Sequence, residues 1–337
     1  TRGTVAEDYT KMLADLDYAE ANLPASQGTG GISTYRATKA AAIALKMRIK
    51  LCQNDWPGVI TEGNKLIPTA AINPLNFTAV VSPIGAWGLT PAVNGPFADN
   101  ASKESIFSIK NDALDNTGTN ASMARMFQSI SVGARGLVAI SPISWNLPEW
   151  TCNDRRRTNL YYFGATPVGS GVLTSKYTDI VNQSDWTPMI RYAEVLLTQA
   201  EAEARNNGAI SQRGIDLLNT VRNRAIVDSV TNQYTAASLV DKNGLINAIL
   251  KERRIEFLAE GKRWLDIERL ATDPIFGTDG IPAKVVNGFS DVSAFVCSGA
   301  LPALGTPFIP YSDYRFLWPI PLQERNTNPI VAQNPGY

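Results

Sequence analysis

The sequence of 337 residues contains no histidine. This absence removes imidazole metal ligands, the Ser-His-Asp and Cys-His nucleophile systems, and histidine acid–base catalysis. Only three cysteines are present, and none belongs to a CxxC pair. Cys52 lies in a helical pattern as a small apolar residue. Cys152 and Cys297 could pair in an oxidising compartment, but an odd number of cysteines argues against a disulfide framework. We expect neither a metal site nor a cofactor.

An excess of charge of one sign is also missing. Lysine and arginine together number 31, and so do aspartate and glutamate, which gives a formal net charge of zero. The only basic run, Arg155–Arg157, is too short to neutralise a phosphate backbone. Nucleic acid is therefore not an expected partner.

Long apolar runs are absent as well. No stretch approaches the roughly 20 apolar residues that a membrane-spanning helix needs. The first residues, Thr1–Asp8, lack the charged start and apolar centre of a signal peptide, so the sequence reads as a mature or trimmed chain. Hydrophobic residues make up 44% and charged residues 18%, a balance typical of a globular protein.

Apolar residues recur every three or four positions over residues 1–69. This spacing predicts helices over about 8–23 and 33–52, and a third helix that Asp55 and Pro57 open. Ser33 or Thr34 is the expected cap of the second helix, whose alanines allow close helix packing. Helix pairs of this kind resemble tetratricopeptide units, although no clean 34-residue repeat is present.

Residues 70–186 have a different character, because Gly, Pro, Asn, Ser and Thr interrupt every apolar run. A strand is predicted over Ile106–Ile109 and another short element over Val132–Ile140. An irregular region of this length is uncommon, and long loops often carry function. We therefore expect residues 70–186 to form a loop-rich ligand-binding region.

Helical spacing returns over residues 187–337. It predicts a helix from about Thr187, a second capped by Ser211, and a long third helix over about 245–271. The proline-rich remainder should lie extended over a finished surface, with Trp318 and Tyr337 as anchors. The predicted fold class is thus mainly α, with tetratricopeptide-like helix pairs, a long loop-rich insertion and minor β structure.

Short motifs follow one another in a definite order through the helices after residue 187 and the tail. They are Arg191 to Leu197 with Ala200-Glu201-Ala202; Leu218-Asn219, Val221-Arg222 and Arg224-Ala225; Glu252-Arg253-Arg254, Glu256-Phe257-Leu258, Glu260-Gly261, Arg263-Trp264-Leu265-Asp266 and Arg269-Leu270; and Pro319-Ile320-Pro321, Glu324, Asn328-Pro329 and Gln333-Asn334-Pro335-Gly336-Tyr337. This ordered set resembles the SusD/RagB family of outer-membrane nutrient-binding lipoproteins.

The resemblance implies a surface-exposed lipoprotein of the bacterial outer membrane. Such a protein lies over a SusC-like TonB-dependent transporter and delivers glycans to it, or peptides in the RagB branch. The family's chains usually begin with a further helical segment and a lipid-modified cysteine, which this sequence does not contain. Attachment to the membrane through a lipid anchor is therefore an inference from the resemblance alone.

Aromatic and polar residues of the loop-rich region are the candidate ligand contacts. An indole or phenol face stacks on the C–H patch of a sugar ring, while Asn and Asp side chains bind its hydroxyls. The candidates for a glycan site are Trp87, Trp145, Asn146, Trp150, Asp154, Tyr161 and Tyr162. Since tryptophan is also a common core residue, burial of these rings is the competing interpretation.

Two other functions remain open. A peptide-binding receptor of the RagB type would use the same scaffold. A glycoside hydrolase would need two carboxylates, and Glu252 and Glu256 lie one helical turn apart. The arginines interleaved with them lower carboxylate pKa values, whereas a general acid needs a raised one. We therefore interpret both glutamates as ion-pair residues and expect no catalytic residue.

Overall fold

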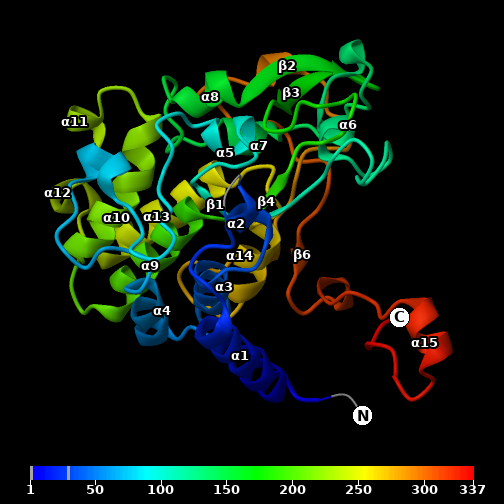
Figure 1. The fold of residues 1–337 in the computed structure, drawn as a ribbon. Helices are drawn as coiled ribbons and strands as arrows, with labels where there is room; N and C mark the ends of the chain where they lie inside the picture. The colour runs from blue at the N-terminus through cyan, green and yellow to red at the C-terminus, as the bar shows by residue number, and fades with distance from the viewer. Residues whose placement is uncertain (1–2, 29–30) are drawn as a thin grey trace.

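The computed structural model describes residues 3–28 and 31–337, and it is mainly helical (Figure 1). The N-terminal helices are α1 (Val5–Asn22), α2 (Ile32–Tyr35), α3 (Lys39–Cys52) and α4 (Trp56–Gly63). The helices after residue 190 are α9 (Tyr192–Asn206), α10 (Gln212–Ala225), α11 (Ser229–Asn232), α12 (Ala236–Leu239), α13 (Lys242–Glu256), α14 (Arg263–Arg269) and α15 (Leu322–Thr327). Short elements between these groups are the 3₁₀ helices η1 (Pro74–Ala79) and η2 (Ile130–Val132) and the helices α5 (Gly95–Ala98), α6 (Met123–Phe127), α7 (Pro142–Trp145) and α8 (Arg155–Asn159). The mainly α fold class is confirmed.

Side-chain caps fix where several of these helices begin. Asp55 accepts a hydrogen bond from the Gly58 amide at the start of α4, and Ser211 caps α10 in the same way through Gly214, as the sequence predicts. The predicted second helix is wrong in one detail. It is divided into α2 and α3, and the cap of α3 is Thr38, because its side chain accepts from the Ala41 amide.

The long helices pack in sequence order, each against the next. α1 contacts α3, α3 contacts α4, and α4 contacts α9, which in turn packs against α10 and α13. Small residues such as Ala40, Ala44, Ala200 and Ala204 are buried at these contacts, which lets neighbouring backbones approach closely. This arrangement forms the helical body, in the lower and left part of Figure 1.

The predicted helix over 245–271 is interrupted. α13 ends at Glu256 and α14 begins only at Arg263. Between them, Ala259 and Gly261 have positive φ values of 66° and 74°, which an α-helix cannot contain. Gly261 adopts this conformation without cost, and the break turns α14 away from the axis of α13.

The strands form three small antiparallel pairs. β1 (Ser105–Ile109) pairs with β4 (Thr187–Arg191), which confirms the predicted strand and shortens the predicted helix from Thr187. β2 (Tyr161–Thr166) and β3 (Gly169–Thr174) form a hairpin, and β5 (Gly280–Ile281) pairs with β6 (Ile309–Pro310). The element predicted over Val132–Ile140 begins with the end of η2 and a turn and continues as chain without regular structure, which in the described residues meets β3 at one bridge, from Ile140 to Val172.

A second layer covers one side of the helical body. It contains α5 to α8, the β2–β3 hairpin and the first part of the tail, and it occupies the upper part of Figure 1. We call this the loop layer. Because η1 packs on α10 and β1 pairs with β4, the region 70–186 is joined to the helical body at both places. The proposed division at residues 69 and 186 stays a prediction.

The tail crosses the loop layer and then extends away from the body to α15 (Figure 1). Its 3₁₀ helices are η3 (Val292–Ala294) and η4 (Tyr314–Phe316). Trp318 meets Trp264 of α14 edge-on, yet the Trp318 side chain remains 70% exposed. The Tyr337 hydroxyl donates to the Leu317 carbonyl, so it fastens the tail to itself. Within residues 3–28 and 31–337, no helix has both the length and the apolarity to cross a bilayer.

Candidate functional site

A buried network of charges lies beneath the loop layer. Glu256 of α13 accepts hydrogen bonds from Arg224 at 2.7 Å, Arg191 at 2.9 Å and Arg156 at 2.9 Å. Glu252 accepts from Arg156 at 2.6 Å, which draws α8 of the loop layer onto α13. The network therefore ties the loop layer to the helical body through pairs that water does not reach.

These partners determine the protonation state of Glu256. Burial raises the pKa of Glu256, but the guanidinium groups of Arg224, Arg191 and Arg156 outweigh it and hold the pKa well below its usual range. Glu256 therefore stays ionised, which is the opposite of what a general acid requires. The interpretation of Glu252 and Glu256 as ion-pair residues is confirmed.

Most of the predicted ligand contacts lie in the interior. The side chains of Trp87, Asn146, Trp150, Asp154 and Tyr161 are buried, and Trp150 has no exposed surface. Trp87 belongs to the core of the helical body, whereas Trp150 and Tyr161 form part of the core beneath the loop layer. The rings of these three residues are covered by protein on both faces, so they cannot stack on a sugar in this conformation.

Two of the buried polar candidates hold the scaffold together. Asp154 caps α8 by accepting from the Arg156 amide at 2.8 Å, and its carboxylate also pairs with the Arg156 guanidinium. The Asn146 amide donates to the carbonyls of Ala294 and Ala300 in the tail. Both side chains are thus occupied by the protein, Asn146 by fixing the tail over α7.

Trp145 and Tyr162 differ from the rest because both are half-buried and reach the surface. The Tyr162 hydroxyl donates to Gln128 at 2.7 Å and accepts from the Ser129 amide at 3.0 Å. Its polar end is therefore engaged within the loop layer. The ring nitrogen of Trp145 donates no hydrogen bond within the described residues. Its indole lies at the edge of an aromatic cluster.

The aromatic cluster consists of Trp145, Phe163 and Phe295, whose ring centroids lie 5.9–6.5 Å apart. Phe163, on β2, is 54% exposed, although its neighbours Tyr161 and Tyr162 were the residues singled out from the sequence. Alternation along a strand places Phe163 and Tyr161 on the same face, yet Tyr161 is buried, so the alternation alone does not predict which ring meets solvent. Phe295 lies 132 residues after Phe163, and no local pattern connects them.

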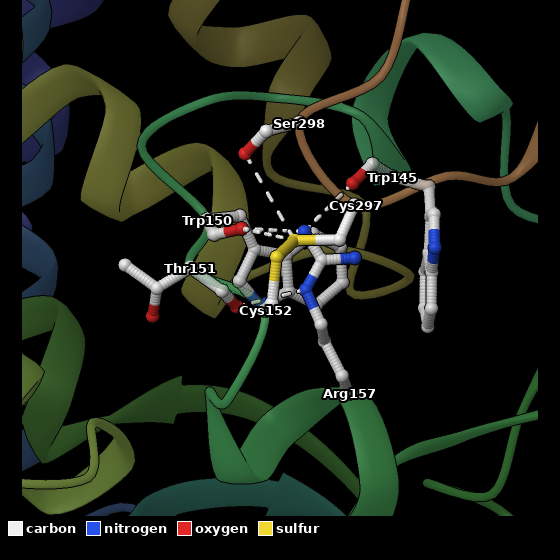
Figure 2. Close-up of a disulfide and its surroundings, with 7 residues drawn as sticks. All are labelled: Trp145, Trp150, Thr151, Cys152, Arg157, Cys297 and Ser298. Carbon is white, nitrogen blue, oxygen red and sulfur yellow. Dashed lines mark hydrogen bonds between the residues drawn. A yellow bond between two sulfur atoms is a disulfide. The ribbon is translucent and has the colours of Figure 1, made fainter.

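An arginine supports this cluster from below. The Arg157 guanidinium lies 4.6 Å from the Trp145 ring centroid and 4.3 Å from that of Trp150, and Figure 2 shows it between these rings and a disulfide. It donates to the carbonyls of Trp145, Trp150 and Thr151 and, among the described residues, to no carboxylate. Burial lowers its pKa to about 10, so Arg157 remains a cation near neutral pH.

The disulfide joins Cys152 and Cys297, so the expectation that these cysteines stay unpaired is wrong (Figure 2). The bond links the loop before α8 to the tail, and its cysteines are 145 residues apart in sequence. An odd cysteine count only requires one residue to be left over, and that residue is Cys52. The disulfide and Asn146 together hold Phe295 against Trp145.

Two cavities open on either side of α7. The first, of about 370 Å³, is lined by residues 136–142, the β2–β3 turn at 166–168, and tail residues 284–289. The second, of about 540 Å³, lies between Ile143, α13 and the tail. Neither cavity is lined by a carboxylate among the described residues. No group of three potential metal ligands was found in the described part of the chain.

Comparison with known proteins gives consistent results. SusD-like protein P2 of Formosa agariphila is 25% identical over 98% of this chain, and the match spans 65% of that relative, just under two thirds of its length. A SusD superfamily structure from Bacteroides fragilis is 28% identical, with a TM-score of 0.63 over 80% of this chain and 55% of its own.

A more distant structure shares the fold alone. Surface glycan-binding protein A from Bacteroides uniformis is 19% identical, with a TM-score of 0.67 over 98% of this chain and 69% of its own. The sequence model of the SusD family matches residues 144–337, which is more than half of the chain. This match includes the motifs of α9, α10, α13 and the tail, and the chain belongs to the SusD family.

Proposed function

We propose that this protein binds a glycan on its loop layer without changing it chemically. The contact surface is the aromatic cluster of Trp145, Phe163 and Phe295, with the cavity of about 370 Å³ beside it. Phe289 lines that cavity and contacts Phe295, so aromatic surface continues from the cluster into the cavity. This continuity is the observation that carries the proposal.

The chemistry of the surface suits a sugar. An aromatic face offers dispersion contact to the C–H groups of a sugar ring, and an open cavity of this size accepts one or two rings. Solved SusD-fold proteins that are described as surface glycan-binding or carbohydrate-binding support the same ligand class. Among the original candidates, Trp145 remains a direct contact, and Tyr162 fixes the hairpin that presents Phe163.

Several features argue against hydrolysis. A glycosidase needs two carboxylates that face one cavity, with one of them protonated at working pH. Glu252 and Glu256 are instead enclosed by arginines, and the pKa of Glu256 is lowered. The two cavities beside α7 present no acid in the described chain. Binding is thus the activity that this surface supports.

Affinity electrophoresis through gels that contain single polysaccharides tests the proposal. The wild-type protein should be retarded by at least one polysaccharide. Trp145→Ala and Phe163→Ala should each weaken that retardation about tenfold, because each variant removes one stacking surface. Trp318→Ala is the matched control, since it removes an exposed indole from the tail and leaves the loop layer intact.

The outcomes separate the competing functions. Release of reducing sugar from a bound polysaccharide would establish a hydrolase. If no polysaccharide retards the protein and an oligopeptide library does bind, the peptide-receptor function is correct instead. Trp150→Ala is unsuitable as a test, because emptying a fully buried indole site destabilises the fold by about 3–5 kcal/mol.

The proposal extends to location and delivery. On the family's pattern, the protein is a surface lipoprotein of the outer membrane that passes its ligand to a SusC-like TonB-dependent transporter. The chain has no expected affinity for nucleic acid, and its link to the membrane would be the lipid anchor. Copurification of a tagged chain with outer-membrane fractions, and with a TonB-dependent transporter, tests this part.

A further inference from the structure

The cavity on the other side of α7 is more strongly cationic than the first, which has Lys284 as its one charged lining residue in the described chain. The charged residues that line this second cavity in the described chain are Lys251, Arg254 and Arg263, and no acid joins them. A smaller neighbouring cavity, of about 220 Å³, is also lined by Arg254 and Arg263, together with Asp266. The two arginines therefore stand between two openings. We call the larger opening the cationic cavity.

Arg254 has little to neutralise it. Its one hydrogen bond within the described chain goes to the Ser144 hydroxyl at 3.2 Å, and no carboxylate lies within ion-pair distance. Burial and the neighbouring charge of Arg263 together lower the pKa of Arg254 to about 10. Glu149 acts in the opposite direction, but its carboxylate lies 3.7 Å from Lys251. A partly buried cation in this position gains stability from any anion that enters the cavity.

The electrostatic surroundings of Arg263 are still less favourable for a cation. It forms no ion pair among the described residues, and burial lowers its pKa despite the nearby charge of Asp266. Asp266 already receives hydrogen bonds from Arg253 and Arg269. Arg263 is also the first residue of α14, the end of a helix at which a positive side chain is disfavoured.

A purely structural role would explain the position of Arg254 but not that of Arg263. Arg254 lies in the last turn of α13, where a cation interacts favourably with the helix carbonyls. That interaction does not account for Arg263, which lies at the opposite end of a different helix. Nor does it account for two guanidinium groups in the lining of one cavity, where the charge of Arg263 lowers the pKa of Arg254.

Much of the remaining lining is apolar, and part of it comes from the tail. Leu301, Leu304 and Phe308 face the cavity, and each is at least 43% exposed. An aromatic and aliphatic wall opposite two guanidinium groups matches a ligand that has both a C–H face and an oxyanion. Guanidinium forks bind carboxylates and sulfates with paired hydrogen bonds.

We propose that the cationic cavity is a subsite for an acidic sugar residue, with Arg254 and Arg263 binding its carboxylate or sulfate ester. This inference rests on the proposed glycan binding and narrows it to acidic glycans. Lys251 lies at the cavity with its charge balanced by Glu149, and the tail wall packs against the sugar ring. The aromatic cluster across α7 then holds neighbouring residues of the same chain.

Matched polysaccharides test the charge alone. Polygalacturonate and its fully methyl-esterified form differ only in the carboxylate, and dextran sulfate and dextran differ only in the sulfate ester. We expect the protein to bind at least one acidic member at least tenfold more tightly than its neutral partner. That preference should weaken as NaCl is raised, because salt screens charge attraction.

The variants locate the effect. Arg254→Gln and Arg263→Gln should each reduce affinity for the acidic glycan about tenfold. Arg254→Lys should recover part of the loss, since it keeps the charge without the fork. Arg325→Gln removes an exposed arginine of α15 and should bind as the wild type does. Circular dichroism of each variant confirms that it is folded.

The results distinguish failure of this inference from failure of the glycan proposal. Equal binding of acidic and neutral members, with both glutamine variants unchanged, overturns the subsite and leaves glycan binding intact. Absence of binding to every polysaccharide overturns both. Preference for polygalacturonate assigns the carboxylate, and preference for dextran sulfate assigns the sulfate ester.

Discussion

The buried charge network and the surroundings of α7 use arginine in different ways. In the body, Arg191, Arg224 and Arg269 are buried, and each pairs with at least two carboxylate groups. In and beside the loop layer, Arg157, Arg254 and Arg263 pair with none in the described chain. A buried cation with partners fixes helix positions, whereas one without partners remains able to bind a ligand. Arginine content alone therefore says little about function.

The largest expected effect comes from breaking a satisfied pair. Arg224→Met removes the cation that binds Glu104 at 2.5 Å and Glu256 at 2.7 Å, and it leaves part of their charge uncompensated. We expect a loss of about 3–5 kcal/mol in the free energy of unfolding. Urea denaturation measures this loss. Arg325→Met, on the exposed surface of α15, should change stability by less than about 0.5 kcal/mol.

The next effect concerns the covalent link between the layers. Replacing both Cys152 and Cys297 by serine frees the tail from the loop before α8. Because the bond closes a large loop, its removal should cost about 2–4 kcal/mol. Cys52→Ser is the control with an intact disulfide. A double variant as stable as the wild type would show that Asn146 and the core contacts hold the tail without the bond.

A smaller effect is expected from acid. Burial raises the pKa of Asp266, but Arg253 and Arg269 outweigh it and lower the pKa to about 2 from an ordinary value of 3.8. The folded state therefore binds the proton more weakly than the unfolded state. The stabilisation from Asp266 is complete above pH 3.8 and disappears as the pH falls toward 2, a change of about 2 kcal/mol. Denaturant titrations at pH 5, 3 and 2 should show this loss, and Asp266→Asn should flatten it.

The sequence predicts the features that depend on residues close in the chain better than those that depend on distant residues. Helix starts at Asp55 and Ser211 and the β1 strand follow from residues close in the chain. The ion pairing of Glu252 and Glu256 was predicted, but their partners are distant arginines such as Arg156 and not the interleaved ones. The break between α13 and α14 was not predicted, because apolar spacing continues through it while the backbone at Ala259 turns left-handed.

The candidate site was harder to predict, since its parts come from distant segments. Trp150 and Trp145 look alike in sequence, and only the packing of the tail across α7 decides that one is buried and the other half-buried. Phe163, Phe295 and the disulfide had no local signal, because they meet through contacts between residues about 130–145 positions apart. The family resemblance supplied the fold, and the three-dimensional packing selected the residues.

The smallest expected effect also discriminates best between the two uses of arginine. Arg254→Met removes a cation that the folded state disfavours, because burial and Arg263 lower its pKa to about 10. We expect the free energy of unfolding to rise by about 0.5–1 kcal/mol, although the acidic-glycan affinity falls. Urea denaturation beside Arg224→Met measures the difference in sign. If both variants lose stability by similar amounts, Arg254 is a structural residue like Arg224, and the distinction between paired and unpaired arginines does not hold.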